Sequence, residues 1–302
     1  MWKVILALVS TALTILAAEA LLRFAEGAPL RIVDGVVLWS TRSPRCDRED
    51  IQRAADDSAA FKIVGLGDSI MYGVSEPKEK TYLEQVRREL GRRSSRRVEI
   101  LNMAVPGYNT IQEYTVYKEI DNLVRPNLVL LHFWEDDAQQ YVSDGARVYY
   151  TSETSADNAA PEFPVLTQLS HVLLVHSCLY DRLFAQMLLR HGRAASRSES
   201  EDWPRTCGAL AEIDHRVRST GGRLLVLASV SLGGAVPEPM GRLSWLRGCA
   251  ASVGFEVIDL SDWLRGLSAS RIAIDGYHFN EEGHRQLGER LADYLLEHDL
   301  KE

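Results

Sequence analysis

The sequence has few cysteines, no excess of proline, glycine or glutamine, and fewer basic than acidic residues. It has 302 residues, four cysteines and a formal net charge of -8 at pH 7. Nucleic-acid binding needs clustered cations that neutralise phosphates, so we expect no nucleic-acid partner. With 46% hydrophobic and 25% charged residues, and without the composition of a disordered chain, the sequence is typical of a globular protein with a sizeable core.

Several motifs of cofactor and metal chemistry are also missing. The sequence contains no Walker loop and no dinucleotide fingerprint, and no C-x-x-C pair that would indicate a zinc ribbon. We therefore expect no metal site and no cofactor. Four cysteines allow three pairings if all are oxidised, and buried free thiols fit the sequence equally well. The cysteines are Cys46, Cys178, Cys207 and Cys249.

The N-terminus carries an apolar run from Val4 to Ala18, preceded by Lys3 and followed by Glu19. Its length lies between that of a signal-peptide core and a minimal membrane span. We favour an uncleaved anchor over residues 1–23, with a signal peptide cleaved after an A-x-A site and a buried helix of a soluble domain as alternatives. The first two place the remaining chain outside the cytosol, either anchored to the membrane or secreted.

After this segment, residues 24–60 are interpreted as a linker and an N-terminal extension. From residue 61 onward, apolar strands alternate with helical periodicity, which predicts an α/β fold with a parallel sheet covered on both faces. Residues 138–202 interrupt the alternation and are expected to form an insertion, with a helix-like run over 172–189. The predicted strands cover residues 62–66, 98–101, 127–133, 224–228 and 255–260, and the predicted helices 81–90, 111–124, 207–219, 244–251 and 281–298.

An arginine run over residues 87–97 is the one concentration of positive charge. Basic residues complement the dipole at a helix C-terminus, so we interpret most of this run as a solvated helix end, with contact to an anionic lipid or polymer as the alternative.

Polar residues follow three predicted elements where a parallel sheet collects its active groups. Ser69 comes just after the first strand, in Gly-Asp-Ser, where it can start a helix; capping of that helix by Asp68 or Ser69 is the simpler alternative. Gly107 lies in a turn after the second strand, where its backbone N–H can approach a ligand. Asp275 and His278 precede the last helix, three residues apart. A histidine base needs a carboxylate that fixes its tautomer.

These motifs together resemble the SGNH (GDSL-type) hydrolase family, over residues 60–298. The resemblance implies a three-layer α/β/α sandwich with a mostly parallel, flavodoxin-like sheet. It implies Ser69 as nucleophile, His278 as base and Asp275 as the residue that orients His278. The N–H groups of Ser69 and Gly107 would form the oxyanion hole, together with an asparagine from a G-x-N-D motif. A G-x-S-x-G elbow is absent because Met71 occupies its last position, which argues against an α/β-hydrolase fold.

The sequence departs from this family at the G-x-N-D motif. Trp134 stands where the family has glycine, and Asp136 where it has asparagine. An ionised carboxylate would repel an oxyanion. Asp136 could be protonated by burial, could turn away, or could be replaced as donor by Asn109. Loss of activity is the fourth reading.

We therefore expect a serine esterase without cofactors, acting as a monomer on a carbohydrate, lipid or cell-envelope ester. An O-acyltransferase acting on envelope polysaccharide shares the same acyl-enzyme and is one alternative. The other is a catalytically weakened carbohydrate-binding relative, in which Trp134 would stack on a sugar.

Overall fold

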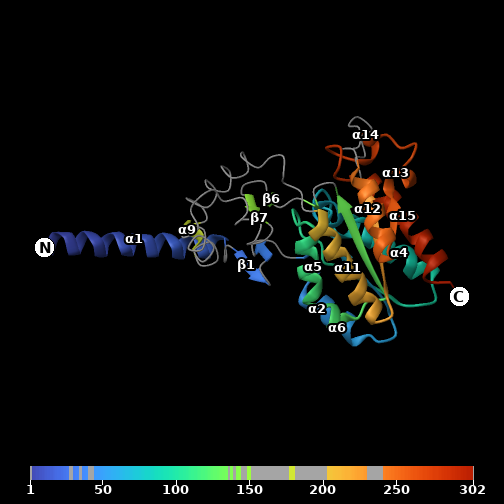
Figure 1. The fold of residues 1–302 in the computed structure, drawn as a ribbon, viewed down its shortest axis with the longest axis horizontal. Helices are drawn as coiled ribbons and strands as arrows, with labels where there is room; N and C mark the ends of the chain where they lie inside the picture. Colours follow the sequence, from blue (N-terminus) through green and yellow to red (C-terminus); the bar gives the residue numbers. More distant parts are fainter. Residues whose placement is uncertain are drawn as a thin grey trace. The chain divides into compact units, whose positions relative to one another are not determined.

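The chain divides into two compact units, and each is described by itself here. The first unit comprises Met1–Ser43 and Gln139–Glu201, and the second comprises Pro44–Ala138 and Asp202–Glu302. In the computed structural model (Figure 1) the described residues are 2–26, 30–33, 36–39, 44–134, 137–138, 141–143, 148–150, 177–180, 203–229 and 241–301. The residues predicted to form an insertion therefore belong with the N-terminal segment.

The first unit begins with the hydrophobic helix α1, Trp2–Glu26. Its described strands form two antiparallel pairs, β1 (Leu30–Val33) with β2 (Val36–Trp39) and β6 (Tyr141–Ser143) with β7 (Val148–Tyr150). Of the helix predicted over 172–189, the described part is α9, Cys178–Tyr180.

The carboxylate of Glu19 joins α1 to α9. It accepts hydrogen bonds from the Ser177 hydroxyl (2.9 Å) and from the backbone N–H groups of Cys178 and Leu179 (3.0 Å each). Within the described residues, no helix combines the length and apolar character needed to span a membrane. The predictions of a membrane anchor and of a cleaved signal peptide both stay predictions.

The second unit is built on a five-stranded sheet in which every pairing is parallel. The strand order is β4-β3-β5-β8-β9, which is the order 2-1-3-4-5 of flavodoxin-like sheets. The central strands are buried along almost their whole length, as expected when helices cover both faces. The strands are β3 (Phe61–Leu66), β4 (Val98–Asn102), β5 (Leu128–Trp134), β8 (Arg223–Ser229) and β9 (Glu256–Asp259).

Helices lie on both faces of this sheet, so the predicted three-layer fold is confirmed. On one face, α4 (Tyr82–Arg93) packs against α15 (Glu281–His298), and their apolar side chains share a core with Ile63 and Leu130. On the other face, α5 (Thr110–Lys118) packs against α11 (Trp203–Ser219) (Figure 1). The remaining elements are α2 (Arg48–Asp56), α3 (Ser69–Tyr72), a 3-10 turn at Lys78–Lys80, α6 (Asp121–Val124), α12 (Arg242–Val253), α13 (Leu260–Trp263) and α14 (Ala269–Ile272).

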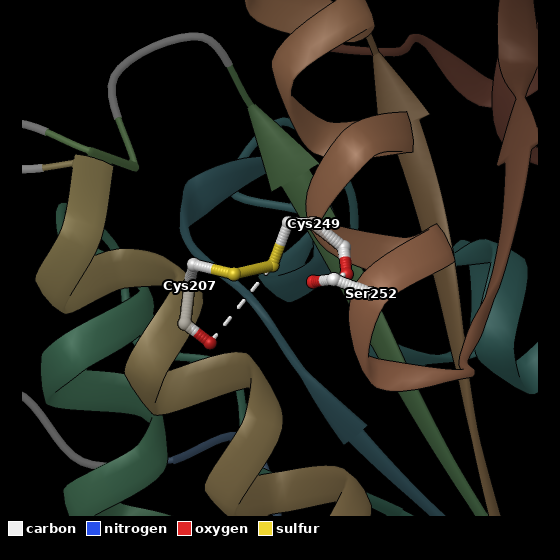
Figure 2. The surroundings of a disulfide bond; sticks show 3 residues. All are labelled: Cys207, Cys249 and Ser252. Atoms are coloured by element: carbon white, nitrogen blue, oxygen red, sulfur yellow. Dashed lines mark hydrogen bonds between the residues drawn. A yellow bond between two sulfur atoms is a disulfide. The ribbon is translucent and has the colours of Figure 1, made fainter.

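A disulfide between Cys207 and Cys249 connects α11 to α12 (Figure 2). Cys46 and Cys178 are free and buried. The Cys46 thiol lies 3.1 Å from the Met103 sulfur, and burial, with a smaller effect of the nearby Asp50, raises its pKa to about 12. The protein thus combines one crosslink with two protected thiols, a mixture that the sequence did not distinguish from the other arrangements.

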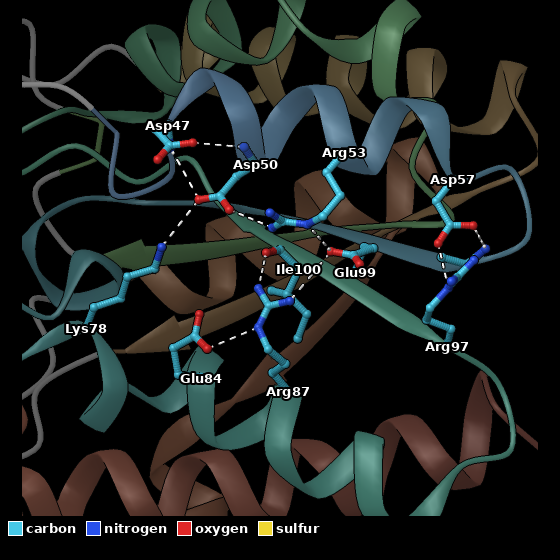
Figure 3. A network of polar contacts seen from close by, with 11 residues as sticks. Asp47, Asp50, Arg53, Asp57, Lys78, Glu84, Arg87, Arg97, Glu99 and Ile100 are labelled. Atoms are coloured by element: carbon cyan, nitrogen blue, oxygen red, sulfur yellow. Dashed lines mark hydrogen bonds and ion pairs between the residues drawn. The ribbon is translucent and has the colours of Figure 1, made fainter.

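Four of the six arginines in the run over residues 87–97 pair with carboxylates of the same unit. Arg87 lies between Glu84 and Glu99, and Arg97 pairs with Asp57 at 2.6 Å (Figure 3). Such exposed pairs add little stability, about 0–1 kcal/mol each. They account for the local charge without an external anion.

Removal of the disulfide is expected to destabilise the second unit. The crosslink closes a loop of 42 residues, which in the chain-entropy model corresponds to about 4 kcal/mol of stability. Urea unfolding of a Cys207→Ser/Cys249→Ser variant should show this loss. Dithiothreitol should lower the stability of the wild type to that of the variant and leave the variant unchanged. Equal stability of the two proteins without reductant would contradict the crosslink.

Candidate active site

Ser69 is held at the carboxyl end of β3 by a tight turn. Asp68 is the N-cap of α3, and its carboxylate accepts a 2.8 Å hydrogen bond from the Ile70 N–H. A Cβ atom on Gly67 would lie 2.8 Å from the Cβ of Met71, so a side chain at position 67 would push the turn away from its helix. The sequence Gly-Asp-Ser therefore places the serine on the first residue of a helix, beyond the sheet edge.

His278 and Asp275 lie in one turn between α14 and α15. Asp275 Oδ1 accepts hydrogen bonds from the backbone N–H of His278 (2.8 Å) and of Tyr277 (3.3 Å). The turn is closed by a bridge between Ala273 and Phe279, with the Ile274 N–H donating to the His278 carbonyl at 2.9 Å. The carboxylate thus organises the turn before it meets the imidazole.

The three residues form one continuous hydrogen-bonded chain. Asp275 Oδ2 lies 2.7 Å from His278 Nδ1, and His278 Nε2 lies 2.8 Å from Ser69 Oγ. Burial acts to raise the pKa of Asp275, but the hydrogen bonds from the His278 ring and from the two backbone N–H groups outweigh it and lower the pKa. An ionised Asp275 keeps the proton of a neutral His278 on Nδ1. Nε2 is then left to accept the serine proton.

Gly107 lies in the turn between β4 and α5 with a positive φ of 80°. The segment before it runs alongside the end of β3, where the Met103 N–H donates to the Gly65 carbonyl (2.8 Å) and the Val105 N–H to the Gly67 carbonyl (3.0 Å). The Gly107 turn is therefore fixed to the same sheet edge as the Ser69 turn.

Asn109 has a structural role in that turn. It caps α5 in a reciprocal arrangement, in which its side chain accepts from the Gln112 N–H and the Gln112 side chain accepts from the Asn109 N–H. Its side-chain oxygen is thus committed to the helix. Asp136, the residue that Asn109 was to replace as donor, lies outside the described residues.

The aromatic groups beside the triad differ in exposure. Trp134 is 8% exposed, and its ring lies 5.7 Å from that of Tyr277. Tyr277 is 41% exposed, and its ring lies 4.4 Å from the His278 ring. The structure thus buries Trp134, the tryptophan considered for sugar stacking, and exposes a tyrosine next to His278.

A buried polar chain lies under the site, and the sequence analysis missed it. His132 on β5 is hydrogen-bonded through Nδ1 to the Tyr82 hydroxyl (3.0 Å) and through Nε2 to the Ser229 hydroxyl (2.7 Å). Burial lowers the pKa of His132 to about 3 and, with the nearby charge of Arg45, that of His284 to about 4. Both imidazoles are therefore neutral packing groups at ordinary pH. A histidine inside an apolar strand was the only available signal.

Glu113 on α5 is a second buried group without a place in the triad. It is 2% exposed, and neither carboxyl oxygen has a hydrogen-bond partner within the described residues. Burial, increased by the negative charge of Asp68, raises the pKa of Glu113 well above its ordinary value. Burial therefore favours the neutral form of this carboxyl group, which lies near Asp68 in the Ser69 turn.

Protonation of Glu113 makes stability depend on pH. The unfolded chain releases this proton near its ordinary pKa of 4.5, whereas the folded protein retains it to higher pH. The contribution of the neutral acid is therefore present below 4.5 and is lost as the pH rises toward the raised pKa, by up to about 1.4 kcal/mol per pH unit. Glu113→Gln should gain stability relative to the wild type between pH 5 and pH 8 in urea unfolding. Glu79→Gln, at an exposed glutamate, is the control. Parallel stability curves would contradict the assignment.

Comparison with known proteins finds similarity among solved structures. No protein-family model and no curated protein matches the sequence. A lipase/acylhydrolase from Enterococcus faecalis is 18% identical, with a TM-score of 0.49, over 80% of this chain and 98% of that chain. An acetylxylan esterase from Geobacillus stearothermophilus is 13% identical, with a TM-score of 0.49, over 80% of this chain and 96% of that chain.

Proposed function

We propose that this protein is a serine esterase that works through a covalent acyl-enzyme. The observation that carries the proposal is the continuous hydrogen-bonded chain from Asp275 through His278 to Ser69. It lies at the carboxyl end of a parallel sheet, where α/β folds place their ligands. It also has the nucleophile on the first residue of a helix, whose N–H groups favour negative charge.

The reaction proceeds in two balanced halves. Ser69 Oγ attacks the ester carbonyl carbon while its proton passes to His278 Nε2, and a tetrahedral oxyanion forms. Collapse of this intermediate breaks the bond to the alcohol oxygen, which receives the proton from His278. Water then attacks the acyl-serine with His278 as base. The acid leaves and Ser69 regains its proton.

The oxyanion is proposed to be stabilised by the backbone N–H groups of Ser69 and Gly107. Loss of one oxyanion donor costs about 3–4 kcal/mol in other serine hydrolases. With Asp136 in place of the third donor, the proposed enzyme relies on its backbone donors. The Asp136→Asn variant tests whether Asp136 slows the proposed reaction. A higher rate in this variant would show that the aspartate is a handicap, and a lower rate would show that it has an adapted role.

The proposed substrate is a carbohydrate, lipid or cell-envelope ester whose alcohol part contacts Tyr277. An exposed aromatic ring beside the catalytic histidine offers a flat apolar face with a polar hydroxyl at its end. Transfer of the acyl group to a sugar hydroxyl would use the same intermediate and differs only in the acceptor.

We also propose that the second unit works outside the cytoplasm. The Cys207–Cys249 disulfide supports this location, because such crosslinks persist in oxidising compartments and are rare in the cytosol. The apolar run in α1, which has the length of a signal-peptide core, supports it independently as an export signal.

Labelling with a fluorophosphonate probe tests the proposed chemistry. The wild type should react covalently at Ser69, because His278 removes the serine proton during attack on phosphorus as on a carbonyl. Ser69→Ala should abolish labelling and ester hydrolysis, and His278→Ala should lower the labelling rate by at least about 100-fold. Peptide mass spectrometry of the adduct identifies the modified residue. A folded wild type that does not label would exclude both the esterase and the transferase.

Replacement of Tyr277 tests the proposed alcohol site. Tyr277→Ala should raise KM for bulky esters such as aryl or sugar acetates by about fivefold, since the loss of one stacking contact is worth about 1 kcal/mol. The value of kcat should change little, because Tyr277 makes no bond to the reacting atoms. Tyr277→Phe retains the ring and should keep a KM near that of the wild type. A KM that is unchanged in Tyr277→Ala would place the alcohol elsewhere.

A further inference from the structure

The helix that carries the nucleophile is a single turn, so its carbonyl groups depend on outside donors. A four-residue helix offers few internal partners for its last carbonyls. The carbonyls of Ser69 and Ile70 accept from the N–H groups of residues 73 and 74, as expected for a helix end closed by a left-handed Gly73. The Met71 carbonyl accepts a 3.1 Å hydrogen bond from the Asn102 amide. None of these donors bonds to the next carbonyl, that of Tyr72.

Arg45 supplies the missing donors. Its guanidinium donates to the carbonyls of Tyr72 (3.0 Å), Gly73 (2.9 Å) and Glu76 (2.8 Å), and it lies over the Tyr72 ring at 4.7 Å from the centroid. A planar group with several donors in fixed directions suits three converging carbonyls, and a cation at a helix C-terminus also complements the dipole.

Arg45 differs in this respect from the arginines near it. Arg53 and Arg97, from the same region, pair with carboxylates at the surface (Figure 3). Arg45 is partly buried and takes part in no salt bridge within the described residues. A charge-assisted hydrogen bond to a carbonyl contributes more than a neutral one, so three of them commit the side chain to one loop.

The same loop continues to the histidine. Ser75 donates its hydroxyl proton to the carbonyl of Phe279, the residue after His278. The segment from Tyr72 to Glu76 is thus held by Arg45 on one side and contacts the His278 turn on the other. This arrangement joins two segments that lie about two hundred residues apart in the chain. Their positions must match for the Ser69–His278 hydrogen bond to form.

We infer that Arg45 is a positioning residue that fixes Ser69 relative to His278 through the loop from Tyr72 to Glu76. This inference rests on the proposed esterase function. Arg45 precedes the first strand of the sheet, so a side chain from the N-terminal extension completes the geometry of the site. It contacts neither the substrate nor the reacting atoms, and its effect passes through the loop backbone.

Removal of the guanidinium takes a donor from three carbonyls, of which only that of Gly73 keeps a further one, the Glu76 N–H at 3.2 Å, and allows the loop to shift. A displacement of about 1 Å at a reacting group can lower the rate by about 100-fold. We therefore expect Arg45→Ala to lower kcat and the fluorophosphonate labelling rate by about 10- to 100-fold, with KM changed less than threefold. Lysine carries the charge but lacks the planar guanidinium with its several N–H donors, so Arg45→Lys should recover only a small part of the lost rate.

Chemical rescue separates positioning from a general loss of stability. Guanidinium or ethylguanidinium at low millimolar concentration should raise the labelling rate of folded Arg45→Ala several-fold and leave the wild type unchanged. Arg53→Ala is the matched control from the same extension and should keep the wild-type kcat. Circular dichroism at the assay temperature confirms that each variant is folded.

Each outcome bears on one of the two proposals. Two results would overturn the role of Arg45. One is labelling of folded Arg45→Ala at the wild-type rate. The other is a lower labelling rate that guanidinium does not restore, together with a lower stability of the variant. The esterase would survive either result as long as the wild type labels at Ser69. A wild type that does not label would overturn the esterase itself, before any variant is compared.

Discussion

The hydrogen bond between the Ser69 hydroxyl and His278 Nε2 is the constraint on which the rest of the second unit depends. It joins groups 209 residues apart at 2.8 Å. A parallel sheet makes this distance attainable, because all its strands end at one edge and the loops after them converge. The tight turn at Gly67, the Asp275 turn and the Asn280 side chain, which caps the N-terminus of α15, each fix one part of the approach. An error in any of them would separate His278 from Ser69.

The site is unusual in how much buried polarity surrounds it. His132, held by the Tyr82 and Ser229 hydroxyls, is a satisfied polar chain, which rigidifies a core when all partners are present. Burial instead favours the protonated form of Glu113, because burying an ionised carboxylate would cost far more free energy. These groups lie between the sheet and the helices that carry the loops. They stiffen the base of the site without entering the reaction.

Much of this architecture follows from local pattern, and the remainder does not. Apolar runs predicted all five strands of the sheet, because a doubly covered strand must be apolar along its length. The resemblance at Ser69, Asp275 and His278 depended on short motifs. Arg45 could not be found in this way, since its three acceptors are backbone carbonyls, which carry no sequence signal. The Cys207–Cys249 pairing likewise required the packing of α11 on α12.

That crosslink has a consequence for how the protein can change over time. The 42 residues that separate its cysteines in sequence include the rest of α11, β8 and the first part of α12. Because the helices on both sides are covalently tied, added length in this connection hardly loosens the fold: each doubling of a flexible loop costs only about 0.6 kcal/mol. Changes of chain length between the two cysteines are therefore expected to leave α11 and α12 joined and the sheet in register. The disulfide thus makes this part of the chain tolerant of length changes during evolution.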